Sequence, residues 1–252
     1  MQTELAEQSG IPLPTVSRLM ATLENHGYVA RRTDGRYVRG AALYRLSFEL
    51  DPQGLVRDMV RRQVRLLRDA TEETAGYYVR DRLERFCVET AASEEFLRRT
   101  LSVHVRRPLF VGSAGKVFIA FAETGADALL ELMRREEISV SGSQIERLRT
   151  ECRRVRERGW AVSQGEVAPE AWGVAAPVFV GGVLIGALAT TAPKERRSEA
   201  RIAEHGAVCK AQADELTERL TSALRGNSAP AQSAGWAAAP PDEDPDKRSG
   251  RL

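Results

Sequence analysis

Cysteine is scarce in this sequence of 252 residues, since only Cys87, Cys152 and Cys209 are present and no two of them form a CxxC pair. An odd number of widely spaced cysteines excludes a disulfide scaffold and a zinc finger, and it suits a reducing compartment. An excess of one charge is also lacking, because the formal net charge is only +2. A case for nucleic-acid binding must therefore rest on how the charges are distributed along the chain.

The N-terminal stretch MQTELAEQSG lacks the apolar core of a secretory signal, so we expect a cytoplasmic protein. A long uncharged stretch runs from Ala171 to Pro193, and its length would suffice to span a bilayer. Pro177 and the pair Gly181-Gly182 divide it into two runs rich in Val, Ile and Thr. Two such runs joined at a Gly-Gly turn predict a buried β-hairpin over 174–190, and no membrane association.

The length suggests two domains. The first fifty residues contain short helical and hairpin patterns, and an irregular apolar stripe predicts one long helix over 51–75. Beyond these, the patterns predict strands over 77–80, 86–90 and 101–105, and helices over 114–123, 126–137, 144–158 and 198–224. The Ala/Pro/Ser/Gly-rich end and its acidic run PPDEDPD predict a disordered tail over 226–252.

Residues 3–25 have the pattern of two short helices joined by a tight turn at Gly10. In the second helix, apolar residues at i, i+3, i+4 and i+7 predict one buried face, made by Val16, Leu19, Met20 and Leu23. The opposite face carries short polar groups and one guanidinium. This arrangement is typical of a helix-turn-helix, whose second helix enters the major groove of DNA.

A basic hairpin is predicted at 28–39, where alternating residues flank Asp34-Gly35. Between Gly10 and Arg45 there are six arginines and two acidic residues, so this segment carries +4. Such a wing suits contacts to phosphates or entry into a minor groove. A protein-docking module with a solvated basic face is the alternative, but the combination of elements favours DNA. Contacts to bases or phosphates are expected from Thr15, Ser17, Arg18, Thr22, Arg31, Arg32 and Arg36.

Three segments resemble the IclR (isocitrate lyase regulator) family of bacterial transcription regulators. The family's winged helix-turn-helix resembles TELAEQSGIPLPTVSRLMATLENHGYVARRTDGRYVRGAALYRLSFEL, its turn into the effector-domain helix resembles RRPLFVGSAGKVFIAF, and its ligand-domain core resembles RVRERGWAVSQGEV…GVAAPVFVGGVLIGALATTAP. The likeness runs from about Thr3 to Leu224. It implies an α+β chain with a winged helix-turn-helix (1–50), a linker helix (51–75) and a C-terminal GAF-like α/β effector-binding domain (76–225).

Two features depart from the family pattern. Members normally have a further helix before the one that starts at Thr3, and we expect this first helix to be missing here. The second helix opens with Leu13-Pro14, where the family commonly has a basic and a hydroxyl residue, so a phosphate contact is expected to be lost and the family's operator sequences are not transferable. The alternative function is therefore an effector-binding protein with a degenerate N-terminal domain that does not bind DNA.

The run from Gly112 to Val117, GSAGKV, has some features of a phosphate loop. The pattern GxxxxGK[ST] requires Gly where Phe110 stands and Ser or Thr where Val117 stands, so nucleotide binding is excluded. Small residues at a helix N-terminus either offer free N–H groups to a carboxylate or merely allow close helix–strand packing. The resemblance favours a ligand at Ser113, Ala114 and Gly115.

The resemblance implies six further residues that line the effector site. Ser163 and Gln164 are expected in the loop after Val162, and Ser163 stands where the family usually has an acidic residue that contacts the ligand, an exchange that eases acceptance of an anion. Thr191 offers a hydroxyl on the same strand face as Ala189, whereas core filling is an equal alternative for Trp172 and Ala189. The six are Ser163, Gln164, Trp172, Gly173, Ala189 and Thr191.

No arrangement of residues for catalysis stands out, and His104 lacks partners at ligand spacing. We predict no enzyme, no metal and no cofactor; a GAF-like enzyme that relies on Lys116 or His104 is a less favoured alternative. The sequence predicts a regulator that binds a double-stranded DNA operator under the control of a small effector, a carboxylate or an aromatic acid. Operator recognition favours a homodimer, and the resemblance implies a dimer of dimers.

Overall fold

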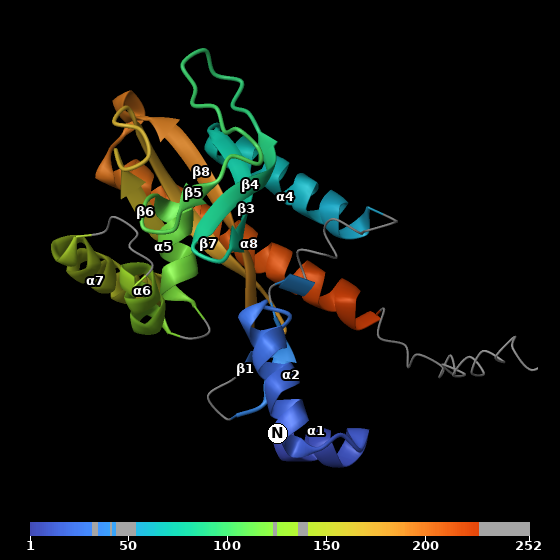
Figure 1. Cartoon of the computed structure of the whole chain (residues 1–252). Coiled ribbons are helices and arrows are strands. Elements are labelled where there is room, and N and C mark those ends of the chain that lie inside the picture. The colour runs from blue at the N-terminus through green and yellow to red at the C-terminus, as the bar shows by residue number, and fades with distance from the viewer. Residues whose placement is uncertain (32–34, 41, 44–53, 123–124, 136–140, 227–252) are drawn as a thin grey trace, which may run out of the picture.

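The computed structural model describes residues 1–31, 35–40, 42–43, 54–122, 125–135 and 141–226 (Figure 1). Its N-terminal part consists of helix α1 (Gln2–Ser9), helix α2 (Leu13–Asn25) and the antiparallel strands β1 (Val29–Arg31) and β2 (Tyr37–Arg39). Gly10 ends α1 in the left-handed conformation, with φ 68°, and Pro14 lies in the first turn of α2, where its missing N–H costs nothing. The predicted helix-turn-helix and its hairpin are confirmed.

The predicted apolar face of α2 is only partly buried. Val16 is buried and Met20 is half-buried, whereas Leu19 and Leu23 are 47% and 39% exposed. The reason is that the described residues of α1 and β1, which contact α2, cover only one side of it. The periodicity therefore identified the helix but overstated how much of its stripe is covered.

The C-terminal part is built on one antiparallel sheet with the strand order β5-β4-β3-β8-β7-β6. Its strands are β3 (Thr74–Asp81), β4 (Glu84–Ala91), β5 (Arg107–Pro108), β6 (Ala161–Gln164), β7 (Ala171–Val180) and β8 (Val183–Pro193). Its helices are α4 (Leu55–Thr71), α5 (Ser113–Ala120), α6 (Ala126–Arg135), α7 (Gly142–Arg158) and α8 (Glu199–Gly226), with the short 3-10 helix η1 (Lys194–Arg196) before α8.

Both faces of this sheet are covered by helices (Figure 1). On one face α4 and α8 pack over alternate residues of β3, β7 and β8, in a core that contains Leu67, Tyr77 and Leu216. On the other face α5, α6 and α7 enclose a second core around Phe118 and Leu130. Successive residues of a strand point to opposite faces of the sheet and so enter different cores, which explains why β7 and β8 are apolar almost throughout.

The uncharged stretch forms the predicted hairpin, with β7 and β8 paired from Ala171–Pro193 to Val180–Val183. Gly181 and Gly182 make the turn with φ of 59° and 82°, values that glycine adopts without strain. Among the described helices, none has a run long and apolar enough to traverse a bilayer. The three cysteines are buried and unpaired, and the predicted disordered tail lies, from residue 227 on, outside the described residues.

Three predictions of secondary structure are wrong. The helix predicted over 51–75 ends at Thr71, because Glu72 adopts a left-handed conformation with φ 59° and β3 starts at Thr74. No strand covers 101–105: Val103 makes one isolated bridge to Cys87, and His104 has φ 62°, which breaks the extended backbone. Ser163 and Gln164, expected in a loop, are instead the last residues of strand β6.

Candidate functional site

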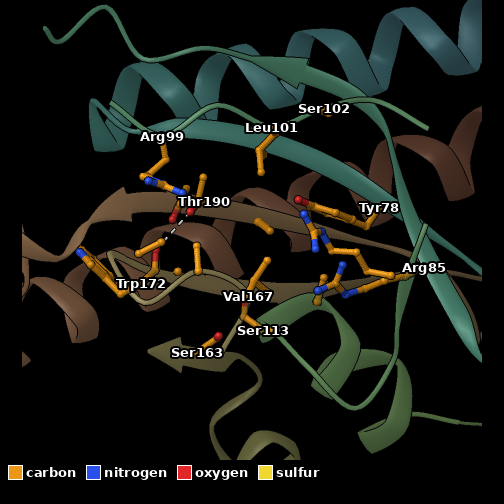
Figure 2. A pocket seen from close by; sticks show the side chains of 18 of the residues that line it. Tyr78, Arg85, Arg99, Leu101, Ser102, Ser113, Ser163, Val167, Trp172 and Thr190 are labelled. Atoms are coloured by element: carbon orange, nitrogen blue, oxygen red, sulfur yellow. Dashed lines mark hydrogen bonds between the residues drawn. The ribbon is translucent and has the colours of Figure 1, made fainter. Parts of the chain in front are cut away.

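A cavity of about 170 Å³ lies between the sheet, the N-terminus of α5 and residues 99–105, which precede β5 and are called the covering segment below (Figure 2). Seven of the nine residues predicted for the effector site line it: Ser113, Ala114, Ser163, Trp172, Gly173, Ala189 and Thr191. The structure therefore brings together residues from α5, β6, β7 and β8 that are far apart in sequence. The cavity is smaller than the 300–1,000 Å³ typical of sites for drug-sized molecules, so its size suits a small metabolite.

Gly115 and Gln164 lie apart from this cavity. A Cβ atom at Gly115 would clash with the carbonyl of Leu109, so this glycine permits close packing of α5, as in the packing alternative. Gln164 is exposed and accepts a hydrogen bond from Arg197 over 2.9 Å. Neither residue presents a polar group to the cavity.

Trp172 reaches the cavity edge but serves mainly the core. Its indole nitrogen donates to the carbonyl of Pro193, and its ring lies 5.2 Å from that of His205 on α8. Figure 2 shows the indole directed away from the middle of the cavity. The carbonyl of Trp172 accepts a hydrogen bond from the hydroxyl of Thr191, so the polar group of Thr191 is already engaged.

Arg85 on β4 is the principal cavity residue that sequence reasoning missed. It is only 4% exposed, and its guanidinium lies 5.3 Å from the ring centre of Tyr78. Its Nη2 donates to the carbonyl of Val111 over 2.8 Å, while its Nε has no hydrogen-bond partner. Burial lowers the pKa of Arg85, but a guanidinium stays protonated at neutral pH. The cavity thus contains a buried positive charge with an unused donor.

Strand alternation was the signal that could have identified Arg85. Phe86 and Val88 pack in the α4–α8 core, so Arg85 and Cys87 must face the opposite side of the sheet. The interpretation failed because arginine is abundant in this sequence, with 33 of the 37 Lys+Arg residues, and no single one stood out.

Two further arginines, Arg99 and Arg107, line the same cavity, and no acidic residue of the described part of the chain does. Arg107 pairs in register with Arg85 across β4 and β5, and Arg99 precedes β5 on the covering segment. Within the described ranges, none of the three guanidiniums forms an ion pair with a carboxylate. The cavity is therefore electropositive, and an anion would bind there without displacing a resident acid.

The N-terminus of α5 is anchored from outside the cavity. Glu166, in the loop between β6 and β7, accepts a hydrogen bond from the backbone N–H of Gly112 over 2.9 Å. The same carboxylate pairs with the buried Lys116, which also contacts Glu151 at 2.7 Å and donates to the carbonyl of Val162. Lys116 is thus engaged in structural contacts, whereas Ser113 and Ala114, in the first turn of α5, line the cavity.

The predicted DNA-contacting residues of α2 differ in their exposure to solvent. Arg18 and Thr22 are exposed, and Thr15 is half-buried. Ser17 is turned inward: its hydroxyl donates to Oε1 of Gln2 over 2.7 Å, and Nε2 of Gln2 donates to the hydroxyl of Tyr37. Ser17 thereby helps to link α1, α2 and the wing.

On the wing, Arg31 and Arg36 flank the hairpin turn and are exposed. Arg32 lies outside the described residues, as do Thr33 and Asp34 at the tip. Arg18, Arg31 and Arg36 supply three positive charges on exposed parts of two adjacent elements. Across the described parts of the chain, no group of three His, Cys, Asp or Glu residues has the geometry of a metal site.

Comparison with known proteins matches both parts of the chain to one family. Residues 1–33 match the IclR helix-turn-helix domain, and residues 53–218 match the C-terminal domain of the bacterial transcriptional regulator IclR. The chain is 27% identical over 227 residues to the HTH-type transcriptional regulator KdgR of Escherichia coli, covering 86% of this chain and 84% of KdgR. It is 24% identical over 224 residues to the transcriptional repressor IclR of Escherichia coli, covering 85% and 81% of the two chains.

Solved structures agree with this result. A putative IclR-family regulator from Rhodococcus sp. is 27% identical, with a TM-score of 0.58 and coverage of 86% of this chain and 85% of that chain. The IclR protein of Thermotoga maritima shares the fold, with a TM-score of 0.59 at 22% identity and coverage of 87% and 90%. The chain belongs to the IclR family of DNA-binding transcriptional regulators, which are not enzymes, and it carries the family's effector-binding domain behind its helix-turn-helix.

Proposed function

We propose that this regulator binds its operator through α2 and the wing, and that a small carboxylate in the cavity changes its affinity for that operator. The proposed division is a winged helix-turn-helix over 1–50, a linker over 51–75 that contains the helix α4 (Leu55–Thr71), and an effector domain over 76–225. The observation that carries the proposal for the effector is the buried Arg85. A buried charge without a carboxylate partner is costly, and a carboxylate ligand would relieve that cost.

The effector's carboxylate is proposed to lie between Arg85 and the N-terminus of α5. The Nε of Arg85 has no partner, and a Cβ at Gly112 would collide with the guanidinium, so glycine allows the charge to approach the helix end. Free N–H groups at the start of a helix and a guanidinium both favour a carboxylate. Aromatic acids are included in the proposal because Tyr78, Leu101 and Val167 add apolar surface.

For the operator, we propose contacts from Thr15, Arg18 and Thr22 on α2 and from Arg31, Arg32 and Arg36 on the wing. Side chains of these types bond to base edges and phosphates. A homodimer would present two such domains to two half-sites, and pairing of two dimers would extend the footprint. The effector acts only through a difference in its affinity for the DNA-competent and DNA-incompetent arrangements.

The effector half of the proposal is tested by thermal unfolding of the purified full-length chain with pyruvate, benzoate and related small carboxylates. A ligand that binds only the folded state raises the melting temperature, and at 100 times its Kd it adds about 2.7 kcal/mol of stability. We expect Arg85→Gln to abolish the shift and Arg98→Gln, an exposed neighbour of the cavity-lining Arg99, to retain it. A shift that is equal in wild type and Arg85→Gln would contradict the assignment of Arg85.

The operator half is tested by binding of a DNA fragment from the region upstream of the chain's own gene, with and without the carboxylate that gives the largest shift. Charge reversal of Arg18, Arg31 and Arg36 is expected to abolish specific binding. If the triple variant binds the fragment as wild type does, the N-terminal domain does not act as proposed. If a bound carboxylate leaves the operator affinity unchanged, the cavity does not regulate DNA binding.

A further inference from the structure

The cavity has positive charge at two separate places. Figure 2 shows Arg85 entering from the β4 side and Arg99 entering from the covering segment, with Leu101 and Val167 between them. Both arginines line the same cavity. A single carboxylate on Arg85 would therefore leave the guanidinium of Arg99 without an anionic partner.

Arg99 is held in place through its backbone. Its carbonyl accepts a hydrogen bond from the hydroxyl of Thr74 at the start of β3 over 2.5 Å. The next residue but one, Leu101, packs over Gly76, where a Cβ would collide with the Leu101 side chain. The covering segment is thus tied to the sheet on both sides of Thr100, while the half-buried guanidinium of Arg99 is left to face the cavity.

The surface between the two arginines is apolar or weakly polar. Leu101 and Val167 lie between the two arginines, and Ala189 and Gly173 of the sheet also line the cavity. Among the described residues that line this cavity, none is acidic, so nothing within it neutralises the second charge. An uncharged centre with a cation at each end is complementary to a short chain with an anionic group at each end.

We propose that the effector is a short aliphatic dicarboxylate, with one carboxylate on Arg85 and the N-terminus of α5 and the other on Arg99. This inference rests on the proposed function and specifies its ligand class. The cavity of about 170 Å³ limits the ligand to a few carbon atoms between the two groups. Arg99 is then the residue that discriminates a dicarboxylate from a monocarboxylate of the same length.

The test is calorimetric titration of the full-length chain with malonate, succinate, glutarate and adipate, each compared with its own half-amide. The half-amide keeps the length and one carboxylate but replaces the second charge with a neutral group. We expect at least one dicarboxylate to bind about tenfold more tightly than its half-amide, the difference typical of a charge-assisted hydrogen bond. Arg99→Gln should remove this preference, Arg99→Lys should keep part of it, and Arg98→Gln should leave it unchanged.

Three results would overturn the inference. The first is that no dicarboxylate binds more tightly than its half-amide, and the second is that the preference persists unchanged in Arg99→Gln. The third is that glycerol 3-phosphate binds more tightly than every dicarboxylate, which would identify a phosphate ester instead. Binding of monocarboxylates that depends on Arg85, without a dicarboxylate preference, would leave the proposed function intact. Absence of binding by any carboxylate would overturn both.

Discussion

Arg85, Gly112 and Gly115 show how single residues set the geometry around the cavity. Gly112 has φ 81° and gives the guanidinium of Arg85 room beside the helix end. Gly115, in the first turn of α5, lets the helix approach the backbone at Leu109. A side chain at Gly115 would push α5 away from the backbone at Leu109, and one at Gly112 would displace the guanidinium of Arg85. The position of the helix therefore depends on the missing Cβ atom at Gly115, and the position of the Arg85 guanidinium on the one at Gly112.

At Gly115 we predict that Gly115→Ala lowers the free energy of unfolding by about 2–3 kcal/mol, the cost of overpacking a rigid interior. The clash is with the backbone of Leu109, which cannot rotate away. Gly142→Ala is the matched control, because it lies at the start of α7 with open space around its Cβ. Urea unfolding of both variants checks this; equal stability of the two would show that α5 has room to shift.

His205 makes the stability of the folded chain depend on pH. Its Nδ1 is buried without a partner, and burial lowers its pKa from the ordinary 6.5, with Arg201 acting in the same direction. A lowered pKa means that the folded state binds fewer protons than the unfolded state. Stability is therefore complete above pH 6.5 and falls as the pH drops below it, by at most about 1.4 kcal/mol per pH unit.

We predict that His205→Gln flattens this dependence between pH 7.5 and 5.5. Denaturant unfolding at several pH values gives the slope directly. His26→Gln, at an exposed histidine, is the control and should retain the slope of the wild type. A slope that is identical in wild type and His205→Gln would assign the acid sensitivity to other groups.

Among the secondary-structure elements, α5 is the one that joins the cavity to the rest of its domain. It packs against β7, β8 and α7, and every residue from Ser113 to Ala120 is buried. The ion-pair cluster of Lys116 with Glu151 and Glu166 ties it to α7 and to the loop before β7. This cluster determines where the start of α5 lies relative to Arg85, although it contributes no group to the cavity.

We predict that Lys116→Met lowers the free energy of unfolding by about 1–2 kcal/mol. The substitution removes a buried ammonium, so two carboxylates and a backbone carbonyl lose their partner. The cost stays below that of a fully buried pair because both carboxylates retain access to water. Lys210→Met removes an exposed pair with Asp214 and should cost less than about 0.5 kcal/mol. Thermal unfolding of the two variants provides the comparison, and an equal loss would refute a structural role for Lys116.

For the whole molecule, the distribution of charge matters more than its sum. The net charge is +2, whereas the segment between Gly10 and Arg45 carries +4 and the cavity contains three arginines. The two concentrations suit different partners, since the first is exposed on α2 and the wing, whereas the second lines a cavity in which Arg85 is buried. A polyanion such as DNA reaches only the exposed one.

We predict that operator binding weakens steeply with salt and that Arg36→Gln lowers the slope of log K against log[salt] by about 1, the value for one lost phosphate contact. Arg153→Gln, on the exposed side of α7, is the control and should leave the slope unchanged. Fluorescence anisotropy of a labelled operator fragment at several salt concentrations measures the slope. An unchanged slope in Arg36→Gln would remove the wing from the interface.

Local patterns were sufficient for the helix-turn-helix, for the Asp-Gly wing and for the β7–β8 hairpin, because turn residues and apolar periodicity act over a few neighbouring positions. The strand predicted over 101–105 failed for the same reason: its apolar alternation is real, but these residues cover the cavity instead of pairing along β4. A local sequence pattern does not reveal which distant segment of the chain a stretch of residues packs against.

The sequence by itself determined the helix-turn-helix, the wing, the β7–β8 hairpin, the family and the clustering of positive charge near the N-terminus, all of which depend on residues close together in the chain. Only the tertiary structure decided which of 33 arginines enter the cavity. Arg85, Arg99 and Arg107 come from two strands and a covering segment, and their side chains converge because the sheet pairs β4 with β5 and the segment folds over Gly76. Burial and the lack of an acidic partner are properties of that packing, so no spacing in the sequence encodes them directly.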